Sequence, residues 1–445
     1  MELLRSGCAF LAVSLTLLSA CSSPKKITAA VETPPAAPIA PTPVIAADTT
    51  AVGGFLDSLF KVNPAFFDSV TAHKKDWNVQ VIYTSIDRSA NGIPKLNNYY
   101  FNVHPENYFY PASTVKFPIA LLALQRLNEL KEKGIDRNTT MITEAGSSTQ
   151  TPVYNDPTTI DGKPTIAQYI KKILMVSDND AFNRLYEFLG QGYINNELHK
   201  KGYADVQILH RLEVSLSPEA NRETNPVKFL NSDGNLLFEQ PMQTNAAQYE
   251  TRHDSLGKNY MKEGRLVEGP MDFSRKNRVS LEDLHNILIS LVFPERVSAS
   301  QRFNLTADDR LFILKYMSQF PTESTYPPYG ADTATYFPAY CKFLLFGGEK
   351  GTPPKNIRIF NKPGDAYGQM LDVAYIVDQS KGVEFFLSAV IYCNSDGVVN
   401  DDHYDYKTIG LPFMKNLGQV IYDYEVKRPK KVAADLSGFK FIYDK

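Results

Sequence analysis

Few of the residues that mark metal or redox sites occur in this sequence. Only four Cys and seven His are present in 445 residues, and no group of them has the spacing of a zinc site. We therefore expect no zinc site, and the serine chemistry that the motifs indicate needs neither a metal nor an organic cofactor. Cys341 and Cys393 are the two thiols of the expected folded part, and the sequence leaves open whether they pair or remain free.

A strong charge of one sign is also lacking. The formal net charge is −2, and no basic cluster alternates with aromatic residues. This composition argues against a nucleic-acid partner. Beyond the N-terminal segment, no stretch approaches the ~20 consecutive apolar residues of a transmembrane helix, so none is expected. The length is sufficient for a large hydrophobic core.

The N-terminal segment has the pattern of an export signal. Arg5 precedes an apolar run over 9–18 that is too short to span a bilayer. The run ends in Leu18-Ser19-Ala20-Cys21, which resembles the processing site of bacterial lipoproteins. The resemblance implies removal of 1–20, a lipid on Cys21 and a place in the cell envelope, at the outer membrane and facing the periplasm or the surface. An ordinary signal peptide is the alternative.

The remaining chain divides by composition. Residues 21–52 are rich in Pro and Ala, which is typical of an extended tether. We expect the folded part at 53–426, with a basic and then aromatic tail at 427–445. Apolar patterns predict a short helix from Phe55 to about Lys74 and further helices at 166–174, 181–189, 279–293, 306–320 and 411–424, and strands at 79–83, 99–103, 357–360, 371–377 and 383–392.

The first candidate for chemistry is Ser113, which Lys116 follows at the start of a strong helix pattern. Residues three apart share a helix face, so Lys116 can reach the Ser113 hydroxyl. A partly desolvated amine can take the proton of this poor nucleophile. The spacing alone indicates only an ordinary helix-start serine, because it recurs at Ser22, Ser23, Ser58, Ser255 and Ser437.

Two further motifs follow along the chain. Ser177-Asp178-Asn179 lies between two predicted helices. The Ser177 hydroxyl can relay a proton to a leaving group, Asn179 can donate to a substrate amide, and Asp178 can brace the loop; a simple helix N-cap is the alternative. On a predicted strand, Asn361-Lys362-Pro363-Gly364 can present a cation and backbone donors to an anionic substrate.

Taken in this order, the motifs resemble the serine β-lactamase and penicillin-binding-protein superfamily, whose signature is Ser-x-x-Lys, Ser-Asp-Asn and Lys-Thr-Gly. Within it, the sequence is most similar to class A β-lactamases. The resemblance implies an α/β fold, an α+β three-layer sandwich with an antiparallel sheet flanked by helices. The sheet would come from an α/β part at 53–112 and 357–426, with an inserted all-helical part at 113–356 and the site at the seam.

The same resemblance implies the roles of the site residues. Ser113 would attack, Lys116 would move its proton and Ser177 would relay to the leaving nitrogen. The substrate would be bound by Asn179, Lys362, Gly364 and Asp365, with the backbone N–H groups of Ser113 and Asp365 as the oxyanion hole.

Residues 210–226, called the omega loop below, resemble the class A loop of that name. By this resemblance Glu213 would activate the deacylating water, and its part in acylation, against Lys116, is disputed for the family. A loop brace between Arg211 and Glu223, with Glu213 merely exposed, is the alternative. Ser217 stands where the family usually has Asn, and Pro363 replaces Thr, which removes a hydroxyl and an N–H.

Insertions relative to the family are expected at about 227–275 and 320–356. They would reshape the substrate cleft or face a partner, or they would be inert elaboration of the surface.

The expected function is hydrolysis of β-lactam amide bonds through an acyl-enzyme, as in class A β-lactamases. A penicillin-binding D-Ala-D-Ala peptidase and a non-catalytic lipoprotein binding module are the alternatives. The expected partners are a small β-lactam or a peptidoglycan peptide, and the membrane through the lipid on Cys21. We expect a monomer.

Overall fold

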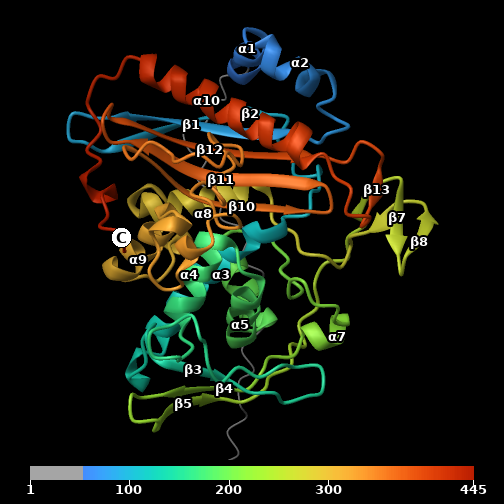
Figure 1. Cartoon of the computed structure of the whole chain (residues 1–445), viewed down its shortest axis with the longest axis vertical. Coiled ribbons are helices and arrows are strands. Elements are labelled where there is room, and N and C mark those ends of the chain that lie inside the picture. The colour runs from blue at the N-terminus through green and yellow to red at the C-terminus, as the bar shows by residue number, and fades with distance from the viewer. Residues whose placement is uncertain (1–53, 445) are drawn as a thin grey trace, which may run out of the picture. The chain divides into compact units, whose positions relative to one another are not determined.

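A five-stranded antiparallel sheet built from both ends of the chain lies at the centre of the computed structural model (Figure 1). The structure describes residues 54–444, so the predicted signal peptide, Cys21 and the tether lie outside the described residues. The strand order is β10-β11-β12-β1-β2. The bounds are β1 (Gln80–Arg88), β2 (Pro94–Phe101), β10 (Ile357–Ala366), β11 (Gln369–Asp378) and β12 (Val383–Tyr392).

The three C-terminal strands form because their sequences are almost continuously apolar. Every residue of β11 is buried, as expected for an inner strand that is covered on both faces. β10 and β11 are joined by the two-residue turn Tyr367-Gly368, where φ is 52° and 79°. Two consecutive positive φ angles define the turn type that matches the twist of a hairpin. This turn fixes the register of β10, the edge strand that carries Lys362.

Helices cover both faces of the sheet (Figure 1). One face packs against α1 (Phe55–Lys61), α2 (Pro64–Ala72) and α10 (Leu411–Lys427), with a core that includes Phe60, Tyr83, Ile376 and Phe413. The other face packs against α8 (Leu281–Val292) and the inserted part. The architecture is therefore the predicted α/β sandwich, with a mixed α/β arrangement around an antiparallel sheet.

The inserted part is helical where it approaches the sheet. It contains α3 (Lys116–Glu129), α4 (Ile166–Val176), α5 (Asn179–Leu189), α6 (Gln191–Lys200) and α9 (Ala307–Ser318). Several of these helices begin at residues whose side chains accept from the first-turn N–H groups, such as Thr165, Asp178 and Thr306. The 14-residue α3 is buried along most of its length and carries the start of the candidate site into the core.

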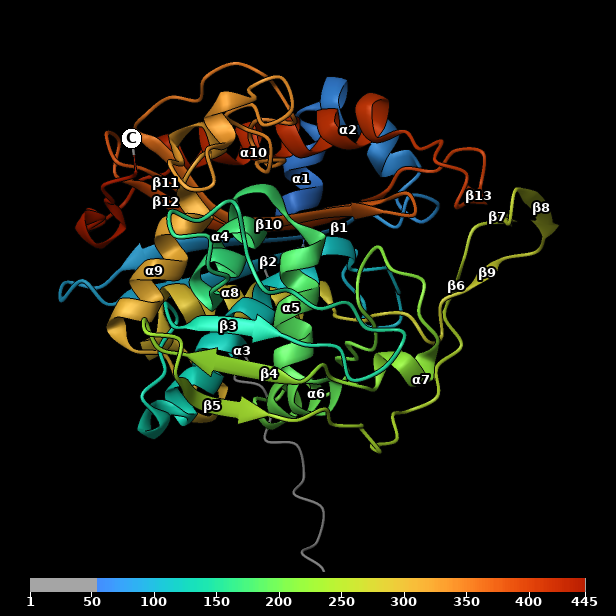
Figure 2. The same cartoon turned by 60° about the horizontal axis from the view of Figure 1, so that its bottom comes forward.

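Strands also occur between 113 and 356, so this part is not all-helical as the sequence predicted. A three-stranded sheet combines β3 (Thr140–Thr143), β4 (Val227–Leu230) and β5 (Leu236–Gln240). The hairpin of β7 (Asn259–Lys262) and β8 (Arg265–Glu268) reaches away from the central sheet (Figure 2) and pairs with β13 (Val398–Val399). β5, β7 and β8 are short and largely exposed or half-buried, so they lack the buried alternation that marks a strand in sequence, whereas β3 and β4 alternate over only four residues each. β6 (Ser255–Leu256) and β9 (Met271–Asp272) form a further pair.

The predicted insertion at 320–356 contains only short 3-10 turns, η5 (Pro321–Glu323) and η6 (Tyr329–Ala331), among loops. It nevertheless contributes buried residues, including Leu344 and Leu345. The sequence left open whether Cys341 and Cys393 pair, and in the structure both are free and buried. Cys341 lies in this segment, and Cys393 follows β12. Within 54–444, no helix is both long and apolar enough to cross a bilayer.

The C-terminal tail folds back onto the helical side of the sheet, an arrangement that the sequence did not predict. The Phe439 ring is buried against Tyr375, at 4.9 Å between centroids, and against Phe360, at 5.6 Å. Asp444 forms an ion pair with Lys315 of α9 at 2.8 Å. The tail therefore closes one edge of the larger core.

We predict that Phe439→Ala lowers the free energy of unfolding by about 3 kcal/mol, because it removes a buried ring and leaves a cavity. The neighbouring Ile442 is 93% exposed, so Ile442→Ala should change stability by less than about 0.5 kcal/mol. Urea denaturation followed by fluorescence measures both. Equal effects of the two substitutions would contradict the packing of the tail.

Candidate active site

Ser113 lies in the short turn η1 (Ala112–Val115), directly before α3. The preceding residue, Ala112, has φ 46°, a left-handed conformation that costs energy for a residue with a side chain. Residues 109–112 are buried, whereas the Ser113 side chain is half-buried at the surface of the helical part. The sequence therefore places a hydroxyl, rather than an apolar side chain, at the one open position of this turn.

Lys116 lies beneath Ser113, and its side chain is fully buried. Its Nζ lies within hydrogen-bond distance of Ser113 Oγ, at 2.9 Å, of Asn179 Oδ1, at 2.5 Å, and of the Ser177 hydroxyl and carbonyl, at 3.2 and 2.5 Å. Burial, assisted by the neighbouring charge of Lys362, lowers the pKa of Lys116 well below its usual value. An amine of this kind can accept the proton of Ser113 near neutral pH.

The Ser177-Asp178-Asn179 motif connects α4 to α5. Ser177 ends α4 in the left-handed region, with φ 62°, and Asp178 caps α5 by accepting from the Ala181 N–H at 2.7 Å. The helix N-cap that was the alternative interpretation of this motif is thus present, and the capping residue is Asp178. It turns the Ser177 hydroxyl and the Asn179 amide toward Lys116.

Lys362 approaches the same hydroxyl from β10. Its Nζ donates to Ser177 Oγ at 2.8 Å and to the Pro363 carbonyl at 2.7 Å. Burial lowers the pKa of Lys362 to about 8. Ser177 therefore lies between two lysine amines, a position suited to the relay of a proton. Pro363 is tolerated because β10 is an edge strand, where a missing N–H is least costly.

Gly364 allows β10 to pass directly against the nucleophile turn. A methyl group at this position would lie 2.7 Å from the Ser113 backbone nitrogen and 3.0 Å from that of Thr114. Only a residue without a side chain fits there, so this close approach requires Gly364. Asp365, the next residue on the strand, is exposed beside the turn. Five candidates, Ser113, Lys116, Ser177, Asn179 and Lys362, are thereby joined by direct hydrogen bonds, and Gly364 and Asp365 adjoin them.

A buried polar cluster behind β10 escaped the sequence reasoning. Lys342 donates to Asn361 Oδ1 at 2.7 Å and to the Met317 carbonyl at 2.5 Å. Asn361 in turn donates to the Asp372 carboxylate at 2.8 Å, and Asp372 also accepts from the Leu344 N–H. The 320–356 insertion is therefore tied to the strand that carries Lys362. No local motif marks Lys342, because its partners are distant in sequence.

Glu213 does not join the hydrogen-bonded group. Its side chain is exposed, and no hydrogen bond or ion pair links it to Lys116, although its charge is close enough to raise the pKa of Lys116 slightly. Asn183 of α5 holds the preceding residue from both sides: it donates to the Leu212 carbonyl at 3.0 Å and accepts from the Leu212 N–H at 2.9 Å. The sequence reasoning missed Asn183, which stands one helix turn after Asn179.

Arg211 braces the omega loop, but its acidic partner is not the Glu223 carboxylate. Its side chain is buried and pairs with Glu187 of α5 at 3.0 Å, and it donates to the Glu223 carbonyl at 2.8 Å. Ser217, in the place where Asn was expected, caps α7 (Pro218–Asn221) by accepting from the Ala220 N–H at 3.1 Å. The Ser217 hydroxyl is therefore engaged within the loop.

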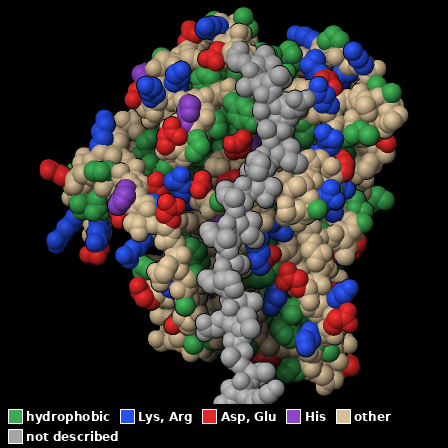
Figure 3. Space-filling view, turned by 180° about the vertical axis from the view of Figure 1, so that it is seen from behind, with side chains coloured by type: hydrophobic (Ala, Val, Ile, Leu, Met, Phe, Trp, Pro, Cys, Tyr) green, Lys and Arg blue, Asp and Glu red, His purple; other side chains and the backbone are tan. Residues whose placement is uncertain are grey.

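The back surface of the molecule shows no single dominant charge. On the face opposite to that of Figure 1, positive and negative side chains are interspersed (Figure 3). Within residues 54–444, no three His, Cys, Asp or Glu side chains are grouped closely enough to hold a metal ion. The site consists of hydroxyls, amines and amides, with the two buried lysines as its main charges.

A hydroxyl beside a desolvated lysine, a second hydroxyl between two lysines and a glycine-bearing edge strand form the arrangement of the serine β-lactamase and penicillin-binding-protein superfamily. The chain belongs to the Beta-lactamase2 family, described as a β-lactamase enzyme family, whose model matches residues 68–424. No curated protein matches the sequence.

Solved structures with a similar fold include penicillin-binding and β-lactamase proteins. PBP-A is 14% identical over 84% of this chain and 97% of its own, with a TM-score of 0.46. A β-lactamase from Xanthomonas campestris is 13% identical over 82% of this chain and 98% of its own, with a TM-score of 0.43. A class A β-lactamase from Clostridium kluyveri is 14% identical over 82% and 98%, with a TM-score of 0.44.

We predict that Asn183→Ala loosens the omega loop next to Glu213. The substitution removes two buried hydrogen bonds, each worth about 1 kcal/mol, so the Leu212 amide should exchange its hydrogen roughly tenfold faster or more. Hydrogen exchange measured by mass spectrometry over 208–216 tests this. Asn128→Ala, which removes hydrogen bonds on another surface, is the control. Unchanged exchange at Leu212 in the Asn183 variant would contradict the assigned anchor.

Proposed function

We propose that this protein is a serine hydrolase that opens β-lactam amide bonds through an acyl-enzyme on Ser113. The observation that supports this most strongly is the buried Lys116 amine, which contacts Ser113 Oγ at 2.9 Å. Burial lowers the pKa of this amine, which favours its neutral form and allows it to accept the Ser113 proton.

Acylation follows from this geometry. Ser113 Oγ attacks the amide carbonyl carbon and passes its proton to Lys116 Nζ. We assign the oxyanion hole to the backbone N–H groups of Ser113 and Asp365, since Gly364, which precedes Asp365, lies directly against the Ser113 backbone nitrogen. When the C–N bond breaks, the nitrogen takes a proton from Ser177 Oγ, and Ser177 regains one from Lys116, 3.2 Å away. Asn179 and Lys362 hold the substrate amide and carboxylate.

Deacylation requires a water and a base to accept its proton. We assign the base to Glu213, whose carboxylate stands on the omega loop near Lys116. The water attacks the ester carbonyl and its proton moves to Glu213; when the ester C–O bond breaks, this proton returns to the Ser113 oxygen and Glu213 is a carboxylate again. Glu213 makes no hydrogen bond to Lys116, and the Ser217 hydroxyl is engaged in capping α7. The deacylating water therefore has fewer fixed hydrogen-bond partners than Ser113 has in the acylation step.

The same observation supports a second candidate, a D-Ala-D-Ala peptidase of the penicillin-binding type. Such an enzyme forms the same acyl-enzyme with a peptide, and a β-lactam traps it because deacylation is slow. The exposed position of Glu213 and the engagement of the Ser217 hydroxyl within the loop support this candidate, because both weaken the deacylation step. Export and lipidation at Cys21 remain predictions from the sequence.

We expect penicillin G to acylate Ser113, which intact-protein mass spectrometry detects as an adduct that Ser113→Ala abolishes. If the protein is a β-lactamase, hydrolysis accompanies the adduct, and Glu213→Gln slows its release by roughly 100-fold. A stable adduct with little hydrolysis in the unchanged protein would assign it to the penicillin-binding class. Absence of both would exclude the two enzymatic functions and favour a binding module.

The acylation rate should depend on pH in a bell shape. It should rise with pH as Lys116 loses its proton, because only the free amine accepts the Ser113 proton. It should fall near pH 8, where Lys362 loses the charge that attracts the substrate carboxylate. Stopped-flow acylation with a β-lactam checks the profile, and Lys362→Gln should lower the rate and remove the falling limb. A rate that climbs steadily to pH 10 in the unchanged protein would contradict these roles.

A further inference from the structure

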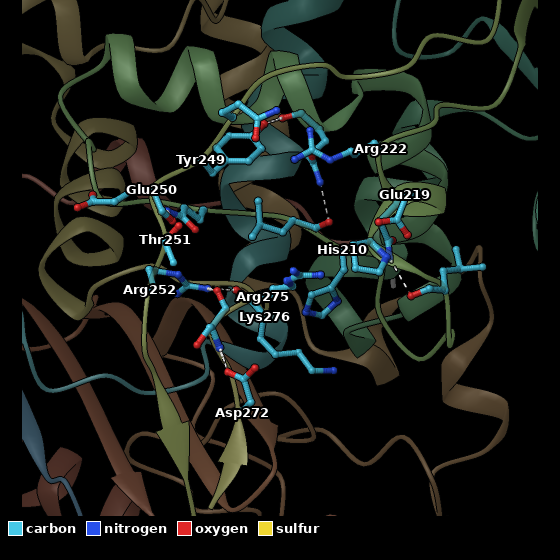
Figure 4. Close-up of a pocket in the computed structure, with 18 of the residues that line it drawn as sticks. His210, Glu219, Arg222, Tyr249, Glu250, Thr251, Arg252, Asp272, Arg275 and Lys276 are labelled. Carbon is cyan, nitrogen blue, oxygen red and sulfur yellow. Dashed lines mark hydrogen bonds between the residues drawn. The ribbon is translucent and has the colours of Figure 1, made fainter.

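Two sets of charged side chains near the site take no part in the proposed chemistry. Those lining the cavity of about 540 Å³ beside the omega loop include exposed groups such as Glu250 and Arg275 (Figure 4). Exposed charges interact strongly with water and only weakly with one another. Lys342 and Asp372, behind β10, are 1% and 0% exposed, so fixed partners must offset the burial of their charges.

The Asn361 amide lies between these two buried charges, and its partners fix its orientation. Its Oδ1 accepts from Lys342 Nζ at 2.7 Å, and an ammonium can only donate. Its Nδ2 donates to the Cys341 carbonyl at 2.8 Å and to the two carboxylate oxygens of Asp372, at 2.8 and 3.0 Å. A flipped amide would place its amino group against the ammonium and its oxygen against acceptors. The cation and the anion therefore hold Asn361 from opposite sides.

The hydrogen bonds also define the ionic form at each end of this cluster. Both oxygens of Asp372 accept from Asn361, and one of them also accepts from the Leu344 N–H at 3.1 Å. Lys342 Nζ donates a second time, to the Met317 carbonyl at 2.5 Å. These contacts suit a carboxylate and an ammonium. One negative and one positive charge therefore lie behind β10.

The cluster adjoins Lys362 both along its strand and across the sheet. Asn361 precedes Lys362 on β10, and Asp372 of β11 lies opposite Pro363, the residue that follows Lys362. Consecutive residues of a strand point to opposite faces, so Asn361 faces the cluster while Lys362 faces Ser177, to which it donates at 2.8 Å. A displacement of Asn361 would therefore be passed along the strand to Lys362.

Several charged or titratable groups face the Lys362 amine from the surrounding elements. Burial lowers the pKa of Lys362, and the negative charges of Asp372 and Asp365 act in the opposite direction. Positive charges nearby repel its ammonium. The groups that face it are Lys116 of α3, Asp365 of β10, Asp372 of β11, and Cys341 and Lys342 of the 320–356 insertion.

We propose that Lys342 and Asp372 are positioning residues for Lys362. Through Asn361 they hold its strand in place, and their two charges act on its ammonium in opposite directions. Asp372 favours the charged form of Lys362, and Lys342 disfavours it. Their balance keeps Lys362 protonated at neutral pH, where it attracts the substrate carboxylate. The consequence for acylation rests on the proposed function, whereas the effect on Lys362 does not.

NMR titration of the full-chain protein with ¹³C-labelled lysine measures the pKa of Lys362, whose signal is the one that Lys362→Gln removes. Asp372→Asn should lower this pKa by roughly one unit, because an attracting charge is lost. Lys342→Gln, which keeps a hydrogen-bond donor, should raise it by about the same amount, because a repelling charge is lost. Asp378→Asn is the matched control: Asp378 is a buried carboxylate at the far end of the same strand, and its loss should leave the pKa unchanged.

Opposite shifts in the two variants would support the proposal, since a purely structural cluster would lose stability in both without a signed effect on Lys362. Shifts of the same sign, no shift in either variant, or an equal shift in Asp378→Asn would overturn it. If Asp372→Asn does not fold, Asn361→Asp takes its place. A carboxylate of the same shape as the amide should raise the pKa of Lys362, and an unchanged or lower value would contradict the proposal.

Stopped-flow acylation by penicillin G reports on Ser113 separately. If the unchanged protein is acylated, the falling limb of its pH profile should move to lower pH in Asp372→Asn and to higher pH in Lys342→Gln. Acylation with a falling limb that stays in place in both variants would reject the role of the cluster and leave the proposed function intact. Opposite NMR shifts without acylation would support the action of the cluster on Lys362 and reject the proposed function.

Discussion

The buried amine of Lys116 is the constraint on which the rest of the site depends. A charged lysine in the core is costly, and here the cost is offset by acceptors from Ser113, Ser177 and Asn179, which come from two separate segments. The strained turn at Ala112 and the junction of α4 and α5 must therefore be held in place, and the edge strand packs against the turn at Gly364. The burial that destabilises the charged form of Lys116 also lowers its pKa and makes the amine a base.

β10 has the second structural role, because it delivers Lys362 to Ser177 and allows the backbone to approach Ser113. Its position is secured from one side by the hairpin with β11 and from the other by Lys342 of the insertion. The insertion is thus part of the support of the site. The omega loop is secured differently, through Asn183 and Glu187 of α5, which leaves Glu213 less constrained than Lys116. This asymmetry explains why the structure supports acylation more strongly than deacylation.

Much of the fold could be predicted because the central strands and helices carry strong apolar periodicity, as at 383–392 and 411–424. The residues joined at the site were identified because their motifs are local. The sequence did not predict features that depend on residues distant along the chain. Arg211 pairs with Glu187 rather than with the Glu223 carboxylate, and the tail residue Phe439 packs on the sheet. Short exposed strands such as β7 and β8 carry no pattern that separates them from loops.

The ionisation of Lys116 is the most direct test of the account. The pKa of its amine can be measured by NMR titration of the protein with ¹³C-labelled lysine, with Lys116→Gln used to assign the signal. We predict a pKa well below that of the exposed lysines, and a similar value in Ser113→Ala, since burial is the main cause. A pKa equal to that of the exposed lysines would show that Lys116 stays charged at neutral pH, and would contradict its role as the base for Ser113.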